Sequence, residues 1–429
     1  MSEKQQVCNF CGKPKQSVAK LIVGVDSAIC NECVNLCTNL LIEDLAQESR
    51  PPPGNMDPEA IRQHLDRYVI GQDRAKMVLS VAIVNHYKRI NCQEPDREIE
   101  KVNILMIGPT GSGKTLLARS VARYLDVPFV IADATSLTEA GYVGDDVESL
   151  ISRLYMNAGQ DVARCQRGIV FIDEIDKISR KSESTSISRD VSGEGVQQAL
   201  LKLVEGTKCR IQPQGGRKHP GNEMIEIDTR NILFIAGGAF VGLENIVKNR
   251  IKGTSIGFQA EVNNDTRGNL DYTTPDDLVR FGLIPEFIGR FPSWVALQEL
   301  DLSDLIAILT EVKNCYTEQY KWLFEQDQIN LEFEIAALKT IAENTIKNKT
   351  GARGLHSELE RVLLPHMYNL SRYRTSGIDR VIIDQNLVNN PVELKDSHEQ
   401  TTRSVSTGDR KSTRLNSSHG YISYAVFCL

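Results

Sequence analysis

A glycine-rich turn between an apolar segment and a helical pattern constrains the fold of this chain most. Ile104-Leu-Met-Ile107 is apolar throughout and leads directly into Gly-Pro-Thr-Gly-Ser-Gly-Lys-Thr at 108–115. The residues that follow, Leu-Leu-Ala-Arg-Ser-Val-Ala-Arg, begin a helical pattern. A buried strand, a glycine-rich turn and a helix N-terminus, in this order, form the context that the Walker A pattern requires. The turn therefore predicts a phosphate-binding loop in an α/β domain.

The residue types of this loop suit a nucleotide with its metal ion. Glycines let the backbone approach a phosphate chain, and the helix dipole adds a favourable potential. Lys114 supplies a mobile positive charge, and the Thr115 hydroxyl supplies a ligand for Mg²⁺. We expect the following loop residues around the nucleotide: Gly108, Pro109, Thr110, Gly111, Ser112, Gly113, Lys114, Thr115 and Leu116.

An acidic pair follows a second apolar strand, Gly168–Ile172. Solvated turn carboxylates are the usual fate of an Asp-Glu pair, but a position after a buried strand, downstream of a phosphate loop, favours the Walker B interpretation. Asp173 can then hold the magnesium, directly or through water, and Glu174 can polarise the attacking water. Together the two motifs predict ATP hydrolysis.

Composition restricts the remaining possibilities. A chain of 429 residues, 41% apolar and 25% charged, should hold two or three domains. Its net charge of −6 argues against broad nucleic-acid binding. No apolar run is long enough to span a membrane, and the N-terminus lacks an apolar signal core. We therefore expect a cytoplasmic protein with neither a membrane nor a nucleic acid as partner.

Cysteine spacing predicts a structural zinc site near the N-terminus. Two C-x2-C pairs, Cys8 with Cys11 and Cys30 with Cys33, can place four thiolates around one Zn²⁺, with a hairpin between them. Disulfides are the alternative, and the missing secretory signal speaks against them. Cys37, one helical turn after Cys33, could compete as a ligand or simply pack.

The pattern along the chain predicts several domains. Alternating strands and helices indicate a parallel sheet covered on both faces, with strands that include Val102–Ile107, Phe129–Ala132, Gly168–Ile172 and Asn231–Ile235. A smaller, mostly helical domain follows, ending near Thr375, with a short strand at Val381. We expect a zinc-binding domain at 1–45, a linker at 46–57, a large α/β ATPase domain at 58–300, a small helical lid domain at 301–395 and a tail at 396–429. The last 25 residues or so are polar and then abruptly apolar at Tyr421–Leu429, so we expect a disordered or foreign tail rather than a genuine docking peptide.

Three shorter motifs are ambiguous when taken alone. Gly141-Tyr-Val-Gly144 could be an ordinary turn or a loop tip that grips an apolar surface. Arg353, at the start of a helical run, and Arg290, just before a proline, could be solvated or could reach nucleotide phosphates. Ile256-Gly-Phe258 could be a buried turn or an apolar anchor for a partner.

Taken jointly, these motifs resemble the ClpX family of AAA+ unfoldases from about Cys8 to Asp384. The resemblance implies an AAA+ P-loop domain, a helical lid domain and a treble-clef-like zinc domain. It implies that Val69 and Ile70, in the Tyr68–Gln72 segment, contact adenine. It implies that Arg290 is an arginine finger for a neighbouring subunit's ATP and that Arg353 is the sensor-2 residue. No polar sensor-1 residue can be named after Ile232-Leu-Phe-Ile-Ala.

The same resemblance assigns residues to substrates and to a peptidase. It places Tyr142 and Val143 in a first pore loop, Arg189 and Val191 in a second, and Arg217, Lys218 and His219 at the pore entrance. It makes Ile256, Gly257 and Phe258 the docking segment for the ClpP peptidase. It implies a homohexamer that uses ATP, Mg²⁺ and Zn²⁺ to unfold tagged proteins, brought in part by adaptor proteins, and to deliver them to ClpP.

Two other functions stay open. A protease-independent remodeller could use the same ring, although the docking segment speaks against that as its only role. A nucleic-acid motor is disfavoured by the net negative charge and by the aromatic and aliphatic pair at 142–143, where basic and stacking residues would be expected.

Overall fold

The computed structural model of the chain forms two units, residues 1–56 and 57–429. It describes residues 7–24, 27–38, 57–92, 99–138, 145–179, 193–211, 224–254 and 269–391. No helix among them is long and apolar enough to cross a membrane.

The N-terminal unit is a hairpin followed by a helix. Strands β1 (Leu21–Val23) and β2 (Ala28–Cys30) pair antiparallel, as the spacing of the cysteines predicts, and a helix begins at residue 31. A short 3-10 helix, η1 (Lys15–Ser17), precedes the hairpin. Among the described residues of this unit, the buried apolar cluster contains three cysteines and no large side chain, so a metal is needed to stabilise so small a domain.

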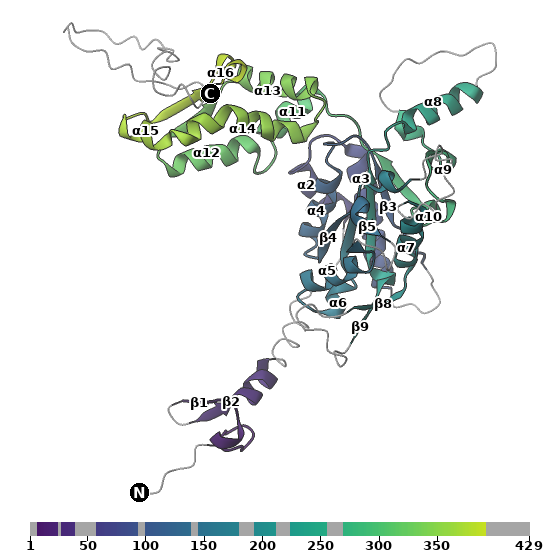
Figure 1. Cartoon of the computed structure of the whole chain (residues 1–429), viewed down its shortest axis with the longest axis vertical. Coiled ribbons are helices and arrows are strands. Elements are labelled where there is room, and N and C mark those ends of the chain that lie inside the picture. The colour runs from purple at the N-terminus through teal and green to yellow at the C-terminus, as the bar shows by residue number, and fades with distance from the viewer. Residues whose placement is uncertain are drawn as a thin grey trace. The chain divides into compact units, whose positions relative to one another are not determined.

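The second unit contains a five-stranded parallel sheet (Figure 1). Its strand order is β11-β3-β10-β7-β4, and every neighbouring pair is parallel. The strands are β3 (Ile104–Ile107), β4 (Phe129–Asp133), β7 (Ile169–Asp173), β10 (Leu233–Gly238) and β11 (Ser293–Ala296). Four of them confirm the strands predicted from sequence. The fifth, β11, was not predicted, because its four residues include polar and half-exposed positions.

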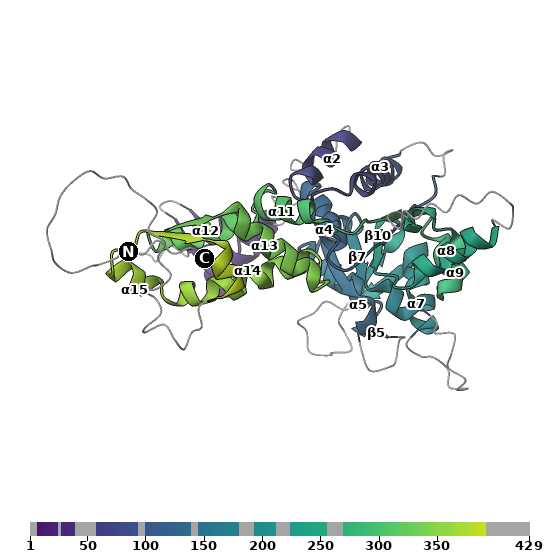
Figure 2. The same cartoon turned by 90° about the horizontal axis from the view of Figure 1, so that it is seen from above.

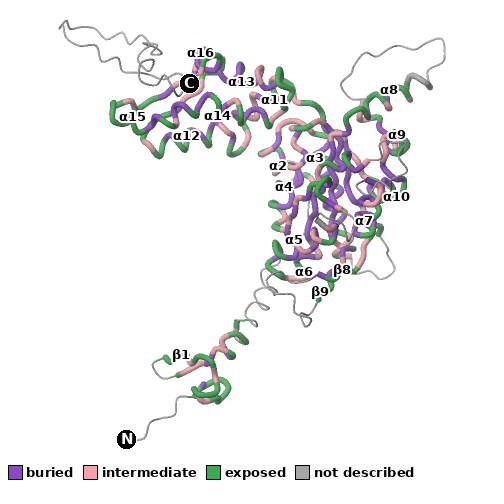
Figure 3. Tube along the Cα trace, viewed as in Figure 1, coloured by how far each residue is buried: buried purple, intermediate pink, exposed green. Residues whose placement is uncertain are grey.

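Helices cover both faces of the sheet, as Figure 2 shows for α2 and α3 on one side and α5 and α7 on the other. Strands β3, β7 and β10 are buried at nearly every position (Figure 3), which is the pattern of a parallel sheet covered by helices on both faces. The helices of this domain are α2 (Pro58–Asp66), α3 (Asp73–Ile90), α4 (Lys114–Tyr124), α5 (Ser149–Asn157), α6 (Val162–Cys165), α7 (Glu194–Glu205), α8 (Leu243–Thr254), α9 (Pro275–Phe281) and α10 (Pro285–Gly289).

Short elements complete the large domain. They are the two-stranded sheets β5 (Leu137–Thr138) with β6 (Asp145–Asp146) and β8 (Lys208–Ile211) with β9 (Ile225–Asp228), and the 3-10 turns η2 (Ala134–Ser136), η3 (Ile175–Ile178), η4 (Thr229–Asn231) and η5 (Asn269–Tyr272).

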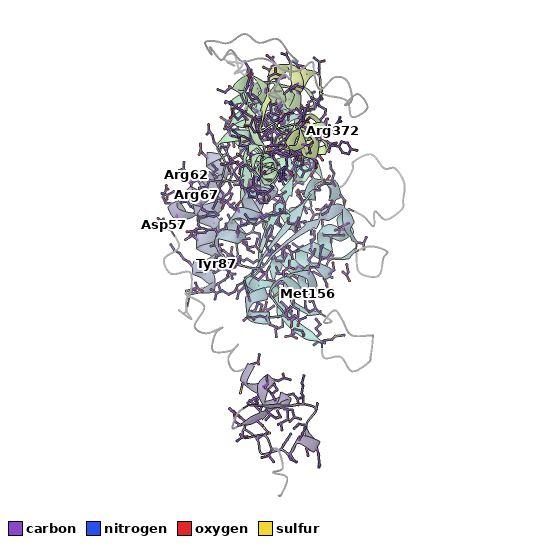
Figure 4. The ribbon with its side chains drawn as sticks, turned by 90° about the vertical axis from the view of Figure 1, so that its left-hand side faces the viewer. Asp57, Arg62, Arg67, Tyr87, Met156 and Arg372 are labelled. Carbon is purple, nitrogen blue, oxygen red and sulfur yellow. The ribbon has the colours of Figure 1, made fainter. Side chains whose placement is uncertain are left out.

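Helix α2 begins at a side-chain cap. Asp57 caps it by accepting from the Glu59 N–H (3.1 Å), and Figure 4 labels Asp57 together with Arg62 and Arg67 along the helix.

The C-terminal domain is mostly helical and has its own core. Its elements are α11 (Leu302–Thr310), α12 (Tyr316–Gln326), β12 (Asn330–Phe333), α13 (Ile335–Lys347), α14 (Ala352–Tyr368), α15 (Leu370–Thr375), β13 (Arg380–Ile383) and α16 (Gln385–Asn389). Asp301 and Asp304 form a capping box at the start of α11, which fixes where the domain begins. The strand predicted at Val381 is confirmed as β13, which pairs parallel with β12.

An ion pair between a buried carboxylate and a partly exposed arginine fixes α8 to the start of α9. The Asp277 carboxylate is fully buried and accepts from Arg250 Nε (3.0 and 3.1 Å). It also accepts from the Thr274 N–H and hydroxyl (both 2.9 Å). Burial alone would raise the pKa of Asp277, but these hydrogen bonds outweigh it and hold the pKa below its ordinary value.

Replacing Arg250 with Met should therefore destabilise the large domain by about 2 kcal/mol, because it removes a charged partner from a buried carboxylate. The chain has two tryptophans, and Trp294 lies on β11, so its fluorescence reports this domain in a Trp322→Phe background. The urea midpoint should fall for Arg250→Met and stay unchanged for Arg280→Met, an exposed position on α9. Equal midpoints would contradict a stabilising role for the pair.

Candidate functional site

Four cysteine sulfurs of the N-terminal unit converge on one point. Their Sγ atoms all lie within 4.8 Å of one another, with Cys8 and Cys33 separated by 3.9 Å and Cys11 and Cys30 by 3.6 Å. A zinc–sulfur bond of about 2.3 Å in a tetrahedron sets sulfur–sulfur distances of about 3.8 Å. The cluster therefore fits a structural Zn²⁺ with four thiolate ligands and no open position.

The disulfide alternative is excluded for these four residues. They are free cysteines, and their sulfurs lie well beyond the bonded distance of about 2.0 Å. Backbone N–H groups also face the sulfurs: Cys30 donates to Cys8 Sγ (3.3 Å) and Cys33 to Cys30 Sγ (3.5 Å). Such donors favour thiolates, which are the metal-binding form. Cys37 is not a member of the cluster.

The glycine-rich loop joins β3 to α4, as the sequence predicts. Gly111 and Gly113 have φ values of 81° and 99°, a conformation that favours glycine. Lys114 is buried, and its Nζ donates to the carbonyls of Gly108 (2.7 Å) and Pro109 (2.9 Å). Burial lowers the pKa of Lys114, and the carboxylates of Asp173 and Asp176 oppose that shift. A bound phosphate chain would add negative charge and favour the ammonium further.

A hollow of about 490 Å³ opens beside this loop. It is lined by Thr110, Gly111, Gly113, Lys114, Thr115, Leu116, Arg119, Asp173, Glu174, Asp176, Lys177, Ala239, Val241, Tyr316, Ala352 and Arg353. Ser112 within the loop has a buried hydroxyl that finds no hydrogen-bond partner among the described residues. A hollow of this size, with positive φ glycines and an unsatisfied loop hydroxyl, fits a nucleoside triphosphate.

The Walker B residues meet the loop at the carboxyl ends of β7 and β3, two parallel strands with β10 between them. Thr115 Oγ1 donates to Asp173 Oδ2 (2.9 Å), so a hydroxyl oxygen and a carboxylate oxygen lie next to each other at the edge of the hollow. Oxygen ligands of this kind suit Mg²⁺, which would supply charge stabilisation to the phosphates there. The Glu174 N–H donates to Asp173 Oδ1 (3.0 Å), and Glu174 takes a left-handed φ of 56°. This turn brings Glu174 to the wall of the same hollow.

The small domain closes one side of the hollow. The turn at Thr350 and Gly351 packs directly against the loop: a Cβ at Gly111 would lie 2.9 Å from the Thr350 carbonyl oxygen. The Ala352 N–H donates to the Gly111 carbonyl (3.4 Å). Arg353, in the first turn of α14, lines the hollow together with Ala352. The candidate site is therefore assembled from both domains of the second unit.

Comparison with known proteins adds the family. Residues 6–43 match the ClpX C4-type zinc finger, residues 99–294 the AAA domain of the Cdc48 subfamily, and residues 300–374 the C-terminal D2-small domain of ClpB protein. The ATP-dependent Clp protease ATP-binding subunit ClpX of Treponema denticola is 51% identical over 392 residues, which are 90% of this chain and 94% of the relative. The chain belongs to the ClpX family. It is therefore an AAA ATPase that uses ATP and Mg²⁺ and holds Zn²⁺ in its N-terminal domain.

The other residues expected in this ClpX-family chain are placed as follows. Val69 is buried next to the loop, where a Cβ at Gly113 would lie 3.8 Å from its Cγ1. Ile70 is half-buried, and neither residue is among those that line the hollow. Arg290 lies at the end of α10 and forms an ion pair with Glu205. Outside the described residues lie Tyr142, Val143, Arg189, Val191, Arg217, Lys218, His219, Ile256, Gly257, Phe258 and the tail.

Sequence reasoning missed several residues that line the hollow. Asp176 is buried, and its Oδ1 accepts from the Ala239 N–H (3.0 Å), so it fixes the chain just after β10. This is the region where no polar sensor residue could be named. Asp176 follows Asp173 by one turn, and that spacing is the signal that could have found it. Arg119 follows Thr115 by four residues on α4, a spacing that could also have found it, whereas Tyr316 comes to the hollow only through the packing of the small domain.

Replacing Cys30 with Ser should remove the zinc, because three thiolates leave the tetrahedral site incomplete. Metal analysis of purified protein should show about one Zn²⁺ per chain for the unchanged protein and close to none for the variant. Cys37→Ser is the matched control and should retain the ion. Zinc loss in the control alone would contradict the assignment of ligands.

Replacing Glu174 with Gln should abolish ATP turnover while leaving ATP binding in place. The amide cannot accept a proton from water, yet it occupies the same volume at the wall of the hollow. We expect the hydrolysis rate to fall by at least about 100-fold. The dissociation constant of a fluorescent ATP analogue should stay within about twofold. A variant that hydrolyses ATP at a normal rate would remove Glu174 from the role of water-activating residue.

Proposed function

We propose that this chain is an ATP-driven protein unfoldase and translocase that works as a homohexameric ring and delivers tagged substrates to a ClpP-type peptidase. The observation that carries the proposal is the assembly of the ATP hollow from two domains. Loop residues of the large domain and Arg353 of the small domain line it together. A change in the phosphates can then alter the angle between the domains, which converts hydrolysis into movement.

The position of Arg290 supports a ring. Its guanidinium is about half exposed, and it is not among the residues that line the chain's own hollow. An arginine finger at this position would reach the ATP of a neighbouring subunit. Each subunit then completes the site of the next, and such head-to-tail contacts close into a ring.

The relative's name supports the peptidase partner. The Treponema denticola protein is called the ATP-binding subunit of the ATP-dependent Clp protease, and the two chains correspond over nearly their whole lengths. By the same family resemblance, Ile256, Gly257 and Phe258 would dock on the peptidase. An apolar anchor of this kind suits a pocket on the partner surface.

The pore segments give the substrate class. Tyr142 and Val143 would grip an unfolded chain by shape and apolar contact, with little dependence on its sequence. Arg189 and Val191 would form a second contact. Arg217, Lys218 and His219 would attract a negative terminus, such as the free carboxylate of a degradation tag or a segment presented by an adaptor.

A test uses a stably folded fluorescent reporter with a C-terminal degradation tag. With ATP and a ClpP-type peptidase, the chain should degrade the reporter; without ATP or without the peptidase it should not. Tyr142→Ala should keep ATPase activity and lose unfolding, whereas Tyr272→Ala, an exposed tyrosine elsewhere, should keep both.

Deleting residues 256–258 in the same assay separates the two candidate functions. The deletion should spare ATP-dependent unfolding and abolish degradation. If the chain remodels the reporter but never supports degradation with any ClpP-type peptidase, the protease-independent remodeller replaces the present proposal. If it does neither with ATP, unfolding itself is contradicted.

A further inference from the structure

Arg290 has one acidic partner in the large domain, at the end of a helix that is distant in sequence. Glu205, the last residue of α7, accepts from Arg290 Nε (2.9 Å) through Oε1, and the same oxygen lies 2.8 Å from Arg290 Nη2 in an ion pair. The two helices α7 and α10 lie next to each other (Figure 1). Among the described residues, no acceptor is found for Arg290 Nη1. The carboxylate therefore holds one edge of the guanidinium and leaves the other edge free.

The position of Glu205 is fixed by the scaffold around the end of α7. The carbonyls of Leu203 and Val204, which have no partner within the helix, accept from Thr229 Oγ1 (2.9 Å) and Lys101 Nζ (3.0 Å). The Thr207 N–H donates to the same Thr229 hydroxyl (2.9 Å). Lys101 and Thr229 thus hold the residues on both sides of Glu205.

The backbone of Arg290 is fixed independently. Its carbonyl accepts from Asn103 Nδ2 (2.9 Å), and Asn103 is buried at the start of β3. Asn103 Oδ1 in turn accepts from the Phe234 N–H (3.3 Å) in β10. The backbone of Arg290 is therefore held in place, and its side chain contacts Glu205.

Gln197 gives α7 two further contacts, one with the turn that follows Glu174 and one with the residue before α10. Gln197, fully buried in α7, donates to the Ile178 carbonyl (2.7 Å) at the end of η3, the turn that follows Glu174. Its Oε1 accepts from the N–H of Ile284 (2.9 Å), the residue that precedes α10. Helix α7 thereby joins the turn behind the chain's own ATP hollow to the element that presents Arg290.

We infer that Glu205 is a positioning residue for Arg290, orienting the guanidinium that one subunit presents to the ATP of its neighbour. The inference rests on the proposed trans role of Arg290. Glu205 takes the Nε side, so the Nη1 edge can meet phosphate oxygens without first breaking the pair. Both side chains are about half exposed, and such pairs contribute little to stability, so the pair biases direction rather than holding the fold.

Mixed rings test this inference, because they separate the subunit that hydrolyses from the subunit that presents the arginine. Subunit X carries Glu174→Gln and keeps Arg290. Subunit Y carries Arg290→Ala and keeps its own Walker residues. ATP turnover in mixed rings then comes from Y sites that face the Arg290 of X.

Adding Glu205→Ala to X should lower the turnover of mixed rings about three- to fivefold, the size of an orienting ion pair. The KM for ATP should change less than about twofold, because the loss concerns the transition state. Glu205→Gln in X should restore part of the turnover, since an amide oxygen still accepts from Nε. Glu286→Ala in X, an exposed acid on the same helix as Arg290, is the matched control and should have no effect.

Adding Glu205→Ala to Y decides between positioning and a general structural role. Subunit Y presents no arginine, so turnover should stay as in the parent mixture, whereas a folding defect would lower it in either subunit. Unchanged turnover with Glu205→Ala in X, or an equal loss in X and Y, would overturn the inference. If X and Y together show no turnover at all, the trans role of Arg290 fails first, and with it the proposed ring.

Discussion

The ATP site depends on the alignment of its parallel strands, which the hydrogen bond from Thr115 to Asp173 requires. This bond joins the first turn of α4 to the end of β7 across 2.9 Å. It requires β3, β10 and β7 to lie parallel, so that their carboxyl ends meet at one edge of the sheet. The buried strands provide that alignment, because each is apolar at nearly every position and is covered on both faces.

The two units of the chain are stabilised by different interactions. The large domain buries an extended apolar core, and a single ion pair such as Arg250 with Asp277 adds to it locally. In the described part of the N-terminal unit there is almost no apolar core, and four sulfurs at metal-binding distances take its place. Zinc is therefore a structural requirement of that unit, separate from the chemistry of the ATP hollow.

Helix α7 connects the turn that follows Glu174 to the side chain of Arg290. Gln197 contacts the turn after Glu174, and Glu205 contacts Arg290, so one helix touches both the turn beside the ATP hollow and the arginine that we propose acts on a neighbouring subunit. The two polar contacts of α7 explain why a buried glutamine and a terminal glutamate occur on a helix whose remaining inner face is apolar.

The sequence by itself determined the nucleotide loop, the acidic pair at 173–174, four of the five strands and the four zinc ligands. These features follow from short spacings and local apolar runs, because a turn or a C-x2-C pair needs only neighbouring residues. Only the tertiary structure decided the contacts of Asp176 with Ala239, Gln197 with Ile284 and Glu205 with Arg290, which join residues 63, 87 and 85 positions apart. No local pattern encodes such pairs, since they exist only once the strands have aligned and the helices have packed against them.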